Sequence, residues 1–196
     1  MSGQPRRLVL ASTSRYRRAL LERLGLAFEV ASPDVVEEIS SGESPGQTAL
    51  RLSVLKAKSV EKQFRDALII GSDQVAAAGA ERYGKPGTHE NAARQLRALS
   101  AKAVDFHTAV TLLDAQTSSM ESRLVGCRVF FRTLDERRIE AYLRREQPYD
   151  CSASAKAEGL GIALIARIET DDPTSLIGLP LIALTEMLER AGVVVV

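Results

Sequence analysis

The 196-residue chain has little of several residue types that mark particular protein classes. It has no tryptophan and two cysteines, and aromatic residues make up 5% of the total. Cys127 and Cys151 show no metal-ligand spacing, which argues against a disulfide scaffold and leads us to expect a reducing, cytoplasmic compartment. Few aromatics and a net charge of +1 argue against an extended nucleic-acid surface.

Long apolar runs are also missing. No stretch reaches the roughly 20 residues that a membrane-spanning helix needs, so no membrane association is expected. The start, MSGQPRRLVLAS, has arginines before apolar residues, but its apolar run is too short for a secretion signal. The signatures G-x-x-x-x-G-K-[ST] and G-x-G-x-x-G do not occur, so neither a P-loop nor a dinucleotide-binding fold is supported.

The remaining composition, 45% apolar and 26% charged, is typical of a globular protein. We expect one domain over residues 1–196, or two lobes that share one core. Strand-like runs alternate with amphipathic helical segments along the chain. Two alternating segments, 104–114 and 122–134, have the pattern of antiparallel strands. The prediction is therefore an α/β fold with a mixed sheet.

Periodicity and capping residues indicate where these elements lie. The expected strands cover residues 8–10, 27–32, 67–77, 104–114, 122–134 and 162–169. The expected helices begin near Tyr16, Ser44, Thr88, Thr133 and Pro180, where hydroxyl caps or proline mark a helix start. In the second helix, Lys56 shares a face with Ala49 and Leu52, so a charge interrupts or borders an inward-facing stripe.

The first helix begins with an unusual concentration of positive charge. Three hydroxyl residues from Ser12 to Ser14 precede Arg15, Arg17 and Arg18. The start of a helix favours anions, so cations there cost stability unless an anion binds. Two interpretations follow: a phosphate site in which Ser12 and Arg17 take part, or a helix capped by Ser14 with its arginines in solvent.

Other charged residues follow predicted strands. Asp73 comes directly after LIIGS, beside an expected turn at the sheet edge, where it could meet water or a metal or form an Asx-turn. Val75 stands where an aspartyl-phosphate phosphatase needs a second aspartate, which argues against that mechanism. The remaining candidates could bind metal or phosphate or lie in solvent: Glu37, Glu38, Lys56 and Lys85.

Taken in order, several segments resemble the Maf family of nucleoside triphosphate pyrophosphatases over essentially the whole chain. They are LVLASTSRYRRALLERLG, PDVVEE, LRLSVLKAKS, IIGSDQV, GKP, AKAEGLG and LIGLPL. Within the family the chain is most similar to the YceF-like branch, whose members hydrolyse 7-methyl-GTP. The resemblance implies a curved mixed sheet flanked by helices, with two lobes and a central substrate cleft. It also implies hydrolysis of 7-methyl-GTP to 7-methyl-GMP and diphosphate.

The resemblance also implies roles for individual residues. Asp73 takes the position of the proton acceptor. Glu37 and Asp73 take positions that would hold a divalent cation, Mg²⁺ or Mn²⁺. The positions implied for triphosphate binding are Ser12, Arg17, Lys56 and Lys85, and those for base selection are Tyr16, Gln74 and Glu158.

The chemistry of two of these side chains favours a positively charged purine as the base of the substrate. The Tyr16 ring could stack on cationic 7-methylguanine, an attraction worth about 1–2 kcal/mol when desolvated. The Glu158 carboxylate could accept both the N1–H and the N2 amine of guanine. The chain departs from the branch pattern at four positions. Tyr16, Val36, Ala153 and Ala155 replace tryptophan, aspartate, glycine and phenylalanine, respectively.

Two alternatives remain open. One is a pyrophosphatase of the same family for dTTP, UTP or another nucleotide. The other is a non-catalytic sensor of nucleotides or RNA ends that grips phosphates with Arg15, Arg17 and Arg18. Whichever function it has, the protein could be a homodimer.

Overall fold

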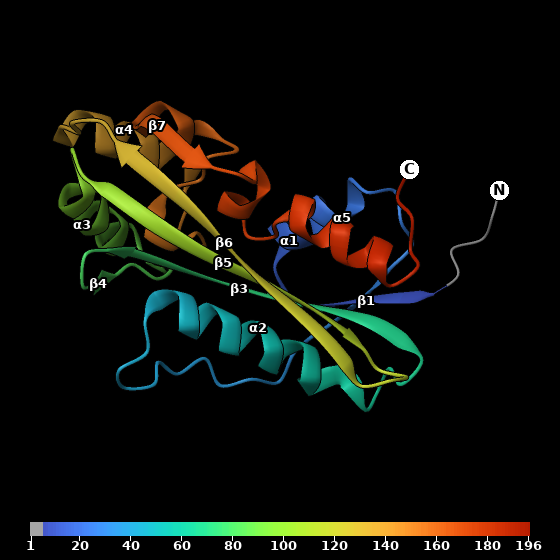
Figure 1. Ribbon diagram of the computed structural model, residues 1–196. Coiled ribbons are helices and arrows are strands. Elements are labelled where there is room, and N and C mark those ends of the chain that lie inside the picture. Colours follow the sequence, from blue (N-terminus) through green and yellow to red (C-terminus); the bar gives the residue numbers. More distant parts are fainter. Residues whose placement is uncertain (1–5) are drawn as a thin grey trace. The chain divides into compact units, whose positions relative to one another are not determined.

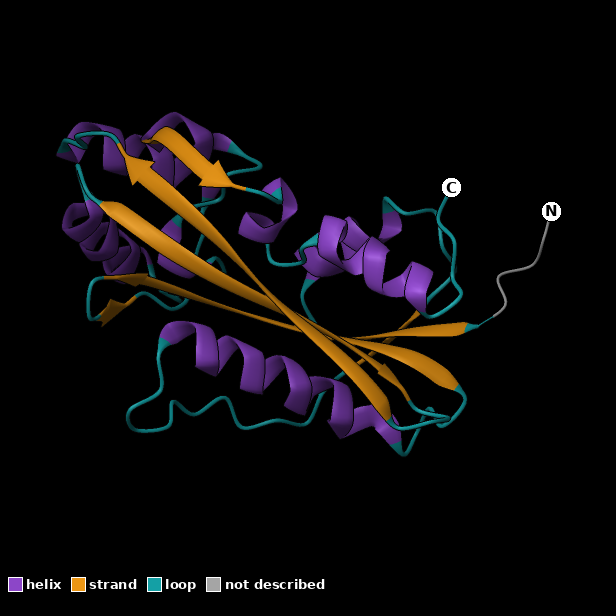
Figure 2. Ribbon diagram, in the orientation of Figure 1, coloured by secondary structure: helices purple, strands orange, loops and turns teal. Residues whose placement is uncertain are grey.

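The computed structural model describes residues 6–196, which form an α/β fold (Figures 1 and 2). The helices are α1 (Arg15–Glu22), α2 (Pro45–Glu61), α3 (His89–Leu99), α4 (Glu136–Glu146) and α5 (Leu181–Arg190). The strands are β1 (Arg7–Ala11), β2 (Glu29–Ala31), β3 (Ala67–Ala78), β4 (Glu81–Arg82), β5 (Ala103–Asp114), β6 (Ser119–Phe131) and β7 (Ile165–Thr170).

The strands form one seven-stranded sheet in the order β2-β1-β3-β5-β6-β7, with β4 paired to β3. β1 runs parallel to β2 and β3, whereas β4 is antiparallel to β3 and β7 is antiparallel to β6. The neighbours β5 and β6 are joined by only four residues, 115–118, which permits an antiparallel hairpin but no parallel crossover. The predicted mixed sheet is confirmed.

The chain divides into two compact units. The first comprises Met1–Gln74, Thr108–Val125 and Asp172–Val196, and the second comprises Val75–His107 and Gly126–Asp171. Strands β3, β5 and β6 contribute residues to both units. Within residues 6–196, no helix combines the length and apolar character that crossing a membrane requires.

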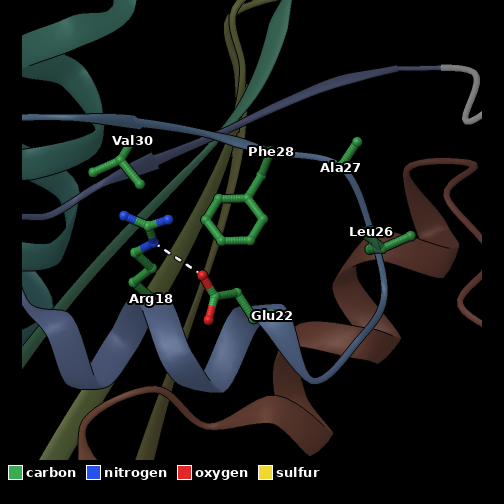
Figure 3. A pocket seen from close by; sticks show the side chains of 6 residues that line it. All are labelled: Arg18, Glu22, Leu26, Ala27, Phe28 and Val30. Atoms are coloured by element: carbon green, nitrogen blue, oxygen red, sulfur yellow. Dashed lines mark hydrogen bonds and ion pairs between the residues drawn. The ribbon is translucent and has the colours of Figure 1, made fainter.

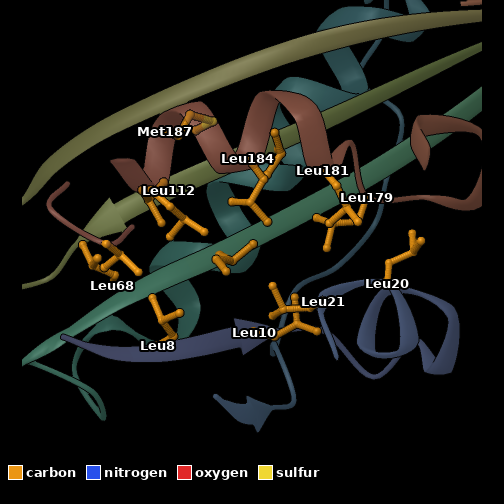
Figure 4. Packing of buried hydrophobic residues seen from close by; sticks show 14 residues of the cluster. Leu8, Leu10, Leu20, Leu21, Leu68, Leu112, Leu179, Leu181, Leu184 and Met187 are labelled. Carbon is orange, nitrogen blue, oxygen red and sulfur yellow. The ribbon is translucent and has the colours of Figure 1, made fainter. Parts of the chain in front are cut away.

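In the first unit, β1 is buried on both faces, which explains its uninterrupted apolar run. Leu8 and Leu10 pack in a cluster with side chains of α1 and α5 (Figure 4), and Val9 and Ala11 pack in another with side chains of α2. Figure 1 accordingly shows α2 on one face of this part of the sheet and α1 and α5 on the other. The alternation along β1 thus determines which helix covers each face.

In the second unit, α3 packs against α4. Two of the predicted boundaries in this unit are wrong. Asp135, not Thr133, caps α4, because its carboxylate accepts a hydrogen bond from the Arg138 N–H at 2.7 Å. Residues 162–169 were predicted as one strand, but Leu160–Leu164 form a 3₁₀-helix and β7 starts at Ile165. Apolar runs of this length do not distinguish strand from helix by periodicity alone.

Candidate active site

The site in the first unit begins with a close approach of α2 to β3 at Gly71. A Cβ atom built on Gly71 would lie 2.2 Å from the Ser53 carbonyl oxygen and 2.8 Å from the Ala57 backbone nitrogen. Only glycine therefore allows the backbones to pack at this distance. As a result, Lys56 on α2 lies next to Asp73, two residues beyond Gly71 on β3.

Lys56 connects two carboxylates. Its Nζ lies 2.6 Å from Asp73 Oδ1 and 2.5 Å from Glu37 Oε1. The Lys56 and Asp73 side chains are only 6% and 8% exposed, whereas the Glu37 side chain, in the loop before α2, is 57% exposed. Lys56 is therefore not the surface lysine that one interpretation of the sequence predicted. Three candidate residues distant in sequence form one ionic cluster.

The surroundings of Asp73 shift the pKa of its carboxyl group. Burial raises its pKa above the usual 3.8, and the positive charges of Lys56 and Arg17 offset part of that rise. The strand predicted over residues 67–77 is confirmed as β3, whereas the turn expected beside Asp73 is wrong, because β3 continues to Ala78. The neighbouring strand β1 instead ends at Ala11, opposite Gly71, so the pairing of β3 with β1 stops just before Asp73.

Arg17 lies within electrostatic range of this cluster. Its Nε donates to the Gly178 carbonyl oxygen at 2.8 Å, and the Ser72 hydroxyl lies 2.9 Å from the same oxygen. Burial lowers the pKa of Arg17, and the charges of Asp73 and Glu37 oppose that effect. Arg17 therefore joins α1 to the turn at Gly178. The sequence motif LIGLPL, which contains Gly178, did not predict this contact.

The start of α1 is capped by its own hydroxyls. Ser14 Oγ accepts the Arg17 N–H at 3.4 Å, and Ser12 Oγ accepts the Ser14 N–H at 3.1 Å. Ser12 is buried and follows the last residue of β1 that pairs with β3. The cap at Ser14 is confirmed, and Arg17 contacts the Gly178 carbonyl oxygen, whereas a phosphate site at these residues stays a prediction.

The loop that carries Glu37 is anchored by Arg51, a residue that the sequence analysis missed. Arg51 Nη2 donates to the Glu38 carbonyl oxygen at 2.8 Å, and Nε donates to Glu43 Oε1 at 2.5 Å. The Arg51 guanidinium lowers the pKa of Glu43 to about 2. In the sequence, the only indication of a role for Arg51 was its positive charge, about one and a half helical turns before Lys56.

The cluster offers two carboxylates, those of Glu37 and Asp73, as ligands for a divalent cation. Within residues 6–196, no group of three or more acid, histidine or cysteine side chains could hold a metal ion. Glu37 and Asp73 nevertheless each place an oxygen against the same Lys56 nitrogen, so both oxygens lie close together. Mg²⁺ is often bound by one or two carboxylates with water and substrate phosphates. Val36, at the position where the branch has an acid, is 73% exposed.

Two residues predicted for base selection also lie in the first unit. The Gln74 amide nitrogen lies within 3.0 Å of Thr108 Oγ1 and of the backbone carbonyl oxygens of Ser175 and Leu176. The Arg15 guanidinium lies 4.8 Å from the centre of the Tyr16 ring. Gln74 therefore ties β3 to the segment before α5, and the Tyr16 ring already has one cation beside it.

Lys85 and Glu158 belong to the second unit. Both residues are exposed, Lys85 in the turn after β4 and Glu158 in the loop after α4. Lys156, in the same loop as Glu158, forms an ion pair with Glu146 at 2.6 Å. Their predicted roles toward substrate stay predictions.

A separate hollow of about 420 Å³ lies beside α1 and β2 (Figure 3). It is lined by Arg18, Glu22, Leu26, Ala27, Phe28 and Val30. Arg18 Nε is 2.9 Å from Glu22 Oε1, so this arginine is paired along its own helix. The hollow therefore adjoins different α1 side chains from those that approach Asp73.

Comparison with known proteins identifies the family of this chain. The family model described as Maf-like protein matches residues 7–191. A protein of Thiobacillus denitrificans named 7-methyl-GTP pyrophosphatase is 59% identical over 95% of this chain and 92% of its own. Proteins with the same name from Cupriavidus pinatubonensis and Burkholderia orbicola are 54% and 53% identical over 95% and 96% of this chain, and 94% and 91% of their own. The chain therefore belongs to the Maf family.

Proposed function

We propose that this protein is a nucleoside triphosphate pyrophosphatase that hydrolyses 7-methyl-GTP to 7-methyl-GMP and diphosphate. The observation that carries the proposal is the buried contact between Asp73 and Lys56, with Arg17 and Glu37 in electrostatic range. The names of relatives that share more than half of their residues with this chain support the same substrate. The proposal includes a cytoplasmic location, in keeping with two cysteines that form no disulfide.

The proposed reaction breaks the bond between the α-phosphorus and the oxygen that bridges it to the β-phosphate. Asp73 orients a water molecule and accepts its proton while the water oxygen attacks the α-phosphorus. A carboxylate whose pKa is raised by burial is a stronger base than an ordinary aspartate. Its ion pair with Lys56 fixes the position of the accepting group before substrate binds.

The departing diphosphate gains negative charge, which positioned cations stabilise. Arg17 and Lys56 supply two of these charges from the first unit, and we assign Lys85 as a third. Ser12 is assigned to the same triphosphate. Glu37 and Asp73 would hold a divalent cation, Mg²⁺ or Mn²⁺, which neutralises phosphate charge when it is bound.

Base selection is assigned to Tyr16, Gln74 and Glu158. The Tyr16 ring offers a stacking surface for the cationic base, in competition with Arg15. The Gln74 amide nitrogen already donates within the protein, so its contribution to the base is confined to its carbonyl oxygen or to positioning. Glu158 is the acceptor for the guanine edge.

The test is diphosphate release from 7-methyl-GTP, GTP, UTP and dTTP in the presence of Mg²⁺. We expect the highest kcat/KM with 7-methyl-GTP. We also expect the variant Glu158→Gln to lose about 1–3 kcal/mol of discrimination for guanine over uracil, the value of a bidentate base contact. The variant Glu169→Gln, an exposed acid of the same unit, serves as the matched control. Preference for UTP or dTTP in the wild-type protein would refute the proposed substrate.

A further inference from the structure

Two segments of the second unit carry the residues that we assign to substrate there. Lys85 lies in residues 84–87, which we call the lysine turn, and Glu158 lies in residues 151–159, which we call the glutamate loop. The glutamate loop contains a short 3₁₀-helix at Ser152–Ser154 and ends before the 3₁₀-helix Leu160–Leu164. Both residues are exposed, so burial does not hold them in place. Their positions depend on how the backbones of the two segments are fixed.

The side chain of Gln95, on α3, contacts both segments. Its Nε2 donates to the Gly84 carbonyl oxygen at 3.1 Å, directly before Lys85. Its Oε1 accepts a hydrogen bond from Ser154 Oγ at 2.6 Å, four residues before Glu158. One amide thus uses its donor on the lysine turn and its acceptor on the glutamate loop.

The lysine turn has further anchors of the same kind. Asn91 Nδ2 donates to the Pro86 carbonyl oxygen at 2.9 Å, and the Gly87 N–H donates to the Tyr149 carbonyl oxygen at 3.0 Å. The carbonyl groups on either side of Lys85 therefore both accept from α3. The Gln95 side chain also reaches the other segment, beside a backbone hydrogen bond from the Ala153 N–H to the Tyr83 carbonyl oxygen, directly before the turn, at 3.3 Å.

The glutamate loop needs such an anchor because its backbone is strained. Ala153 and Ser154 have φ values of 56° and 54°, in the left-handed region that side chains with a Cβ rarely adopt. Such a conformation persists only where the surroundings hold it. Besides Gln95, the Tyr142 hydroxyl holds this loop, since it donates to the Ser154 carbonyl oxygen at 3.2 Å and accepts the Lys156 N–H at 3.0 Å.

We infer that Gln95 is a positioning residue that supports both triphosphate binding at Lys85 and base selection at Glu158. The inference rests on the proposed function, because it uses the roles assigned to those two residues. Only a side chain with both a donor and an acceptor can make the two contacts at once, and an amide provides them on adjacent atoms. Each contact then holds the segment that it reaches, and loss of one contact leaves the other in place.

The test separates the two contacts with three variants. Gln95→Glu keeps an acceptor for Ser154 but loses the donor to Gly84, Ser154→Ala removes only the second contact, and Gln95→Ala removes both. Inhibition by inorganic tripolyphosphate reports on the phosphate side without a base. The ratio of kcat/KM for 7-methyl-GTP to that for UTP reports on base selection.

We expect Gln95→Glu to weaken tripolyphosphate inhibition by about two- to tenfold, the value of one neutral hydrogen bond, with little change in the ratio. Ser154→Ala should lower the ratio by a similar factor and leave tripolyphosphate inhibition unchanged. Gln95→Ala should change both. Glu90→Gln, an acid–amide exchange at an exposed position of α3, is the control for charge and should change neither.

Thermal unfolding of each variant distinguishes positioning from a merely structural role. If the variants lower the melting temperature but the folded protein keeps the wild-type inhibition constant and ratio, the inference is wrong. It is equally wrong if Gln95→Glu and Ser154→Ala both change the same single readout. Failure of the proposed function has a different signature, because the wild-type protein would then release no diphosphate from 7-methyl-GTP.

Discussion

The first unit buries Asp73 and Lys56, which we assign to the reaction, whereas the second unit exposes Lys85 and Glu158, which we assign to binding the triphosphate and the base. Asp73 and Lys56 lie against each other with less than a tenth of either side chain accessible. Lys85 and Glu158 lie at the surface, on segments fixed by hydrogen bonds to their backbones. The two units therefore position charged side chains by different physical means.

This difference follows from what each task requires. A proton acceptor benefits from a low-dielectric environment that raises its pKa, and a buried positive charge needs an acid beside it to compensate for lost hydration. A residue that reads a base must be accessible before the nucleotide arrives, so its own side chain cannot be packed. Rigidity must then come from the supporting backbone contacts.

The largest expected effect tests the buried acid. Asp73→Asn keeps the size of the side chain but cannot accept a proton, so kcat should fall by about 10²–10⁴-fold, the usual contribution of a positioned base. Asp66→Asn, an exposed acid in the first unit, is the control and should retain activity. Diphosphate release by both variants, with circular dichroism to check folding, makes the measurement. A loss of only a few fold would remove Asp73 from the proposed mechanism.

The second prediction tests the close approach that places Lys56 beside Asp73. Gly71→Ala forces a Cβ against backbone atoms of α2, so the free energy of unfolding should drop by at least about 3 kcal/mol, at the upper end for overpacking. Gly126→Ala is the matched control, because its added Cβ meets no atom within 4 Å. Urea unfolding of both variants checks this. Equal stabilities would show that α2 shifts without cost.

The third prediction concerns pH. Lys56 lowers the pKa of Asp73 against the dominant effect of burial, so Lys56→Met should raise that pKa further. Because the base works only when ionised, the acid limb of the kcat/KM profile should move to higher pH. Folding stability should depend on pH as well. Because the pKa of Asp73 is raised in the folded state, this group stabilises the fold at low pH, and the stabilisation is lost as the pH rises through the folded-state pKa. An unmoved or lowered acid limb would contradict the assignment.

The smallest expected effect concerns the strained loop of the second unit. Ala153→Gly removes a side chain from a position with φ of 56°, so it should raise the free energy of unfolding by up to about 1 kcal/mol. Ala155→Gly, two residues later with φ of −115°, should instead lower stability by about 0.5–1 kcal/mol. Calorimetric unfolding measures both. Equal shifts would mean that the left-handed backbone stores no strain.

Much of the candidate site could be predicted from the sequence, because its residues occur in short motifs with distinct chemistry. Asp73 could be identified from an acid that follows a buried apolar run, and Lys56 from a charge within an inward-facing helical stripe. Arg51 and Gln95 could not, because each acts through contacts with loops distant in the sequence. The cap of α4 was misplaced because Thr133 and Asp135 are both good capping residues and only geometry chooses between them.

The sequence by itself determined the mixed α/β fold, since apolar periodicity and capping residues specify most elements locally. It also determined membership of the Maf family through the order of its motifs. Only the tertiary structure decided that Lys56 is buried between two carboxylates, that Arg17 is held at Gly178 and that Gln95 joins two loops. The physical reason is that burial and charge pairing depend on which distant segments meet, and that depends on packing as close as the contact of α2 with Gly71.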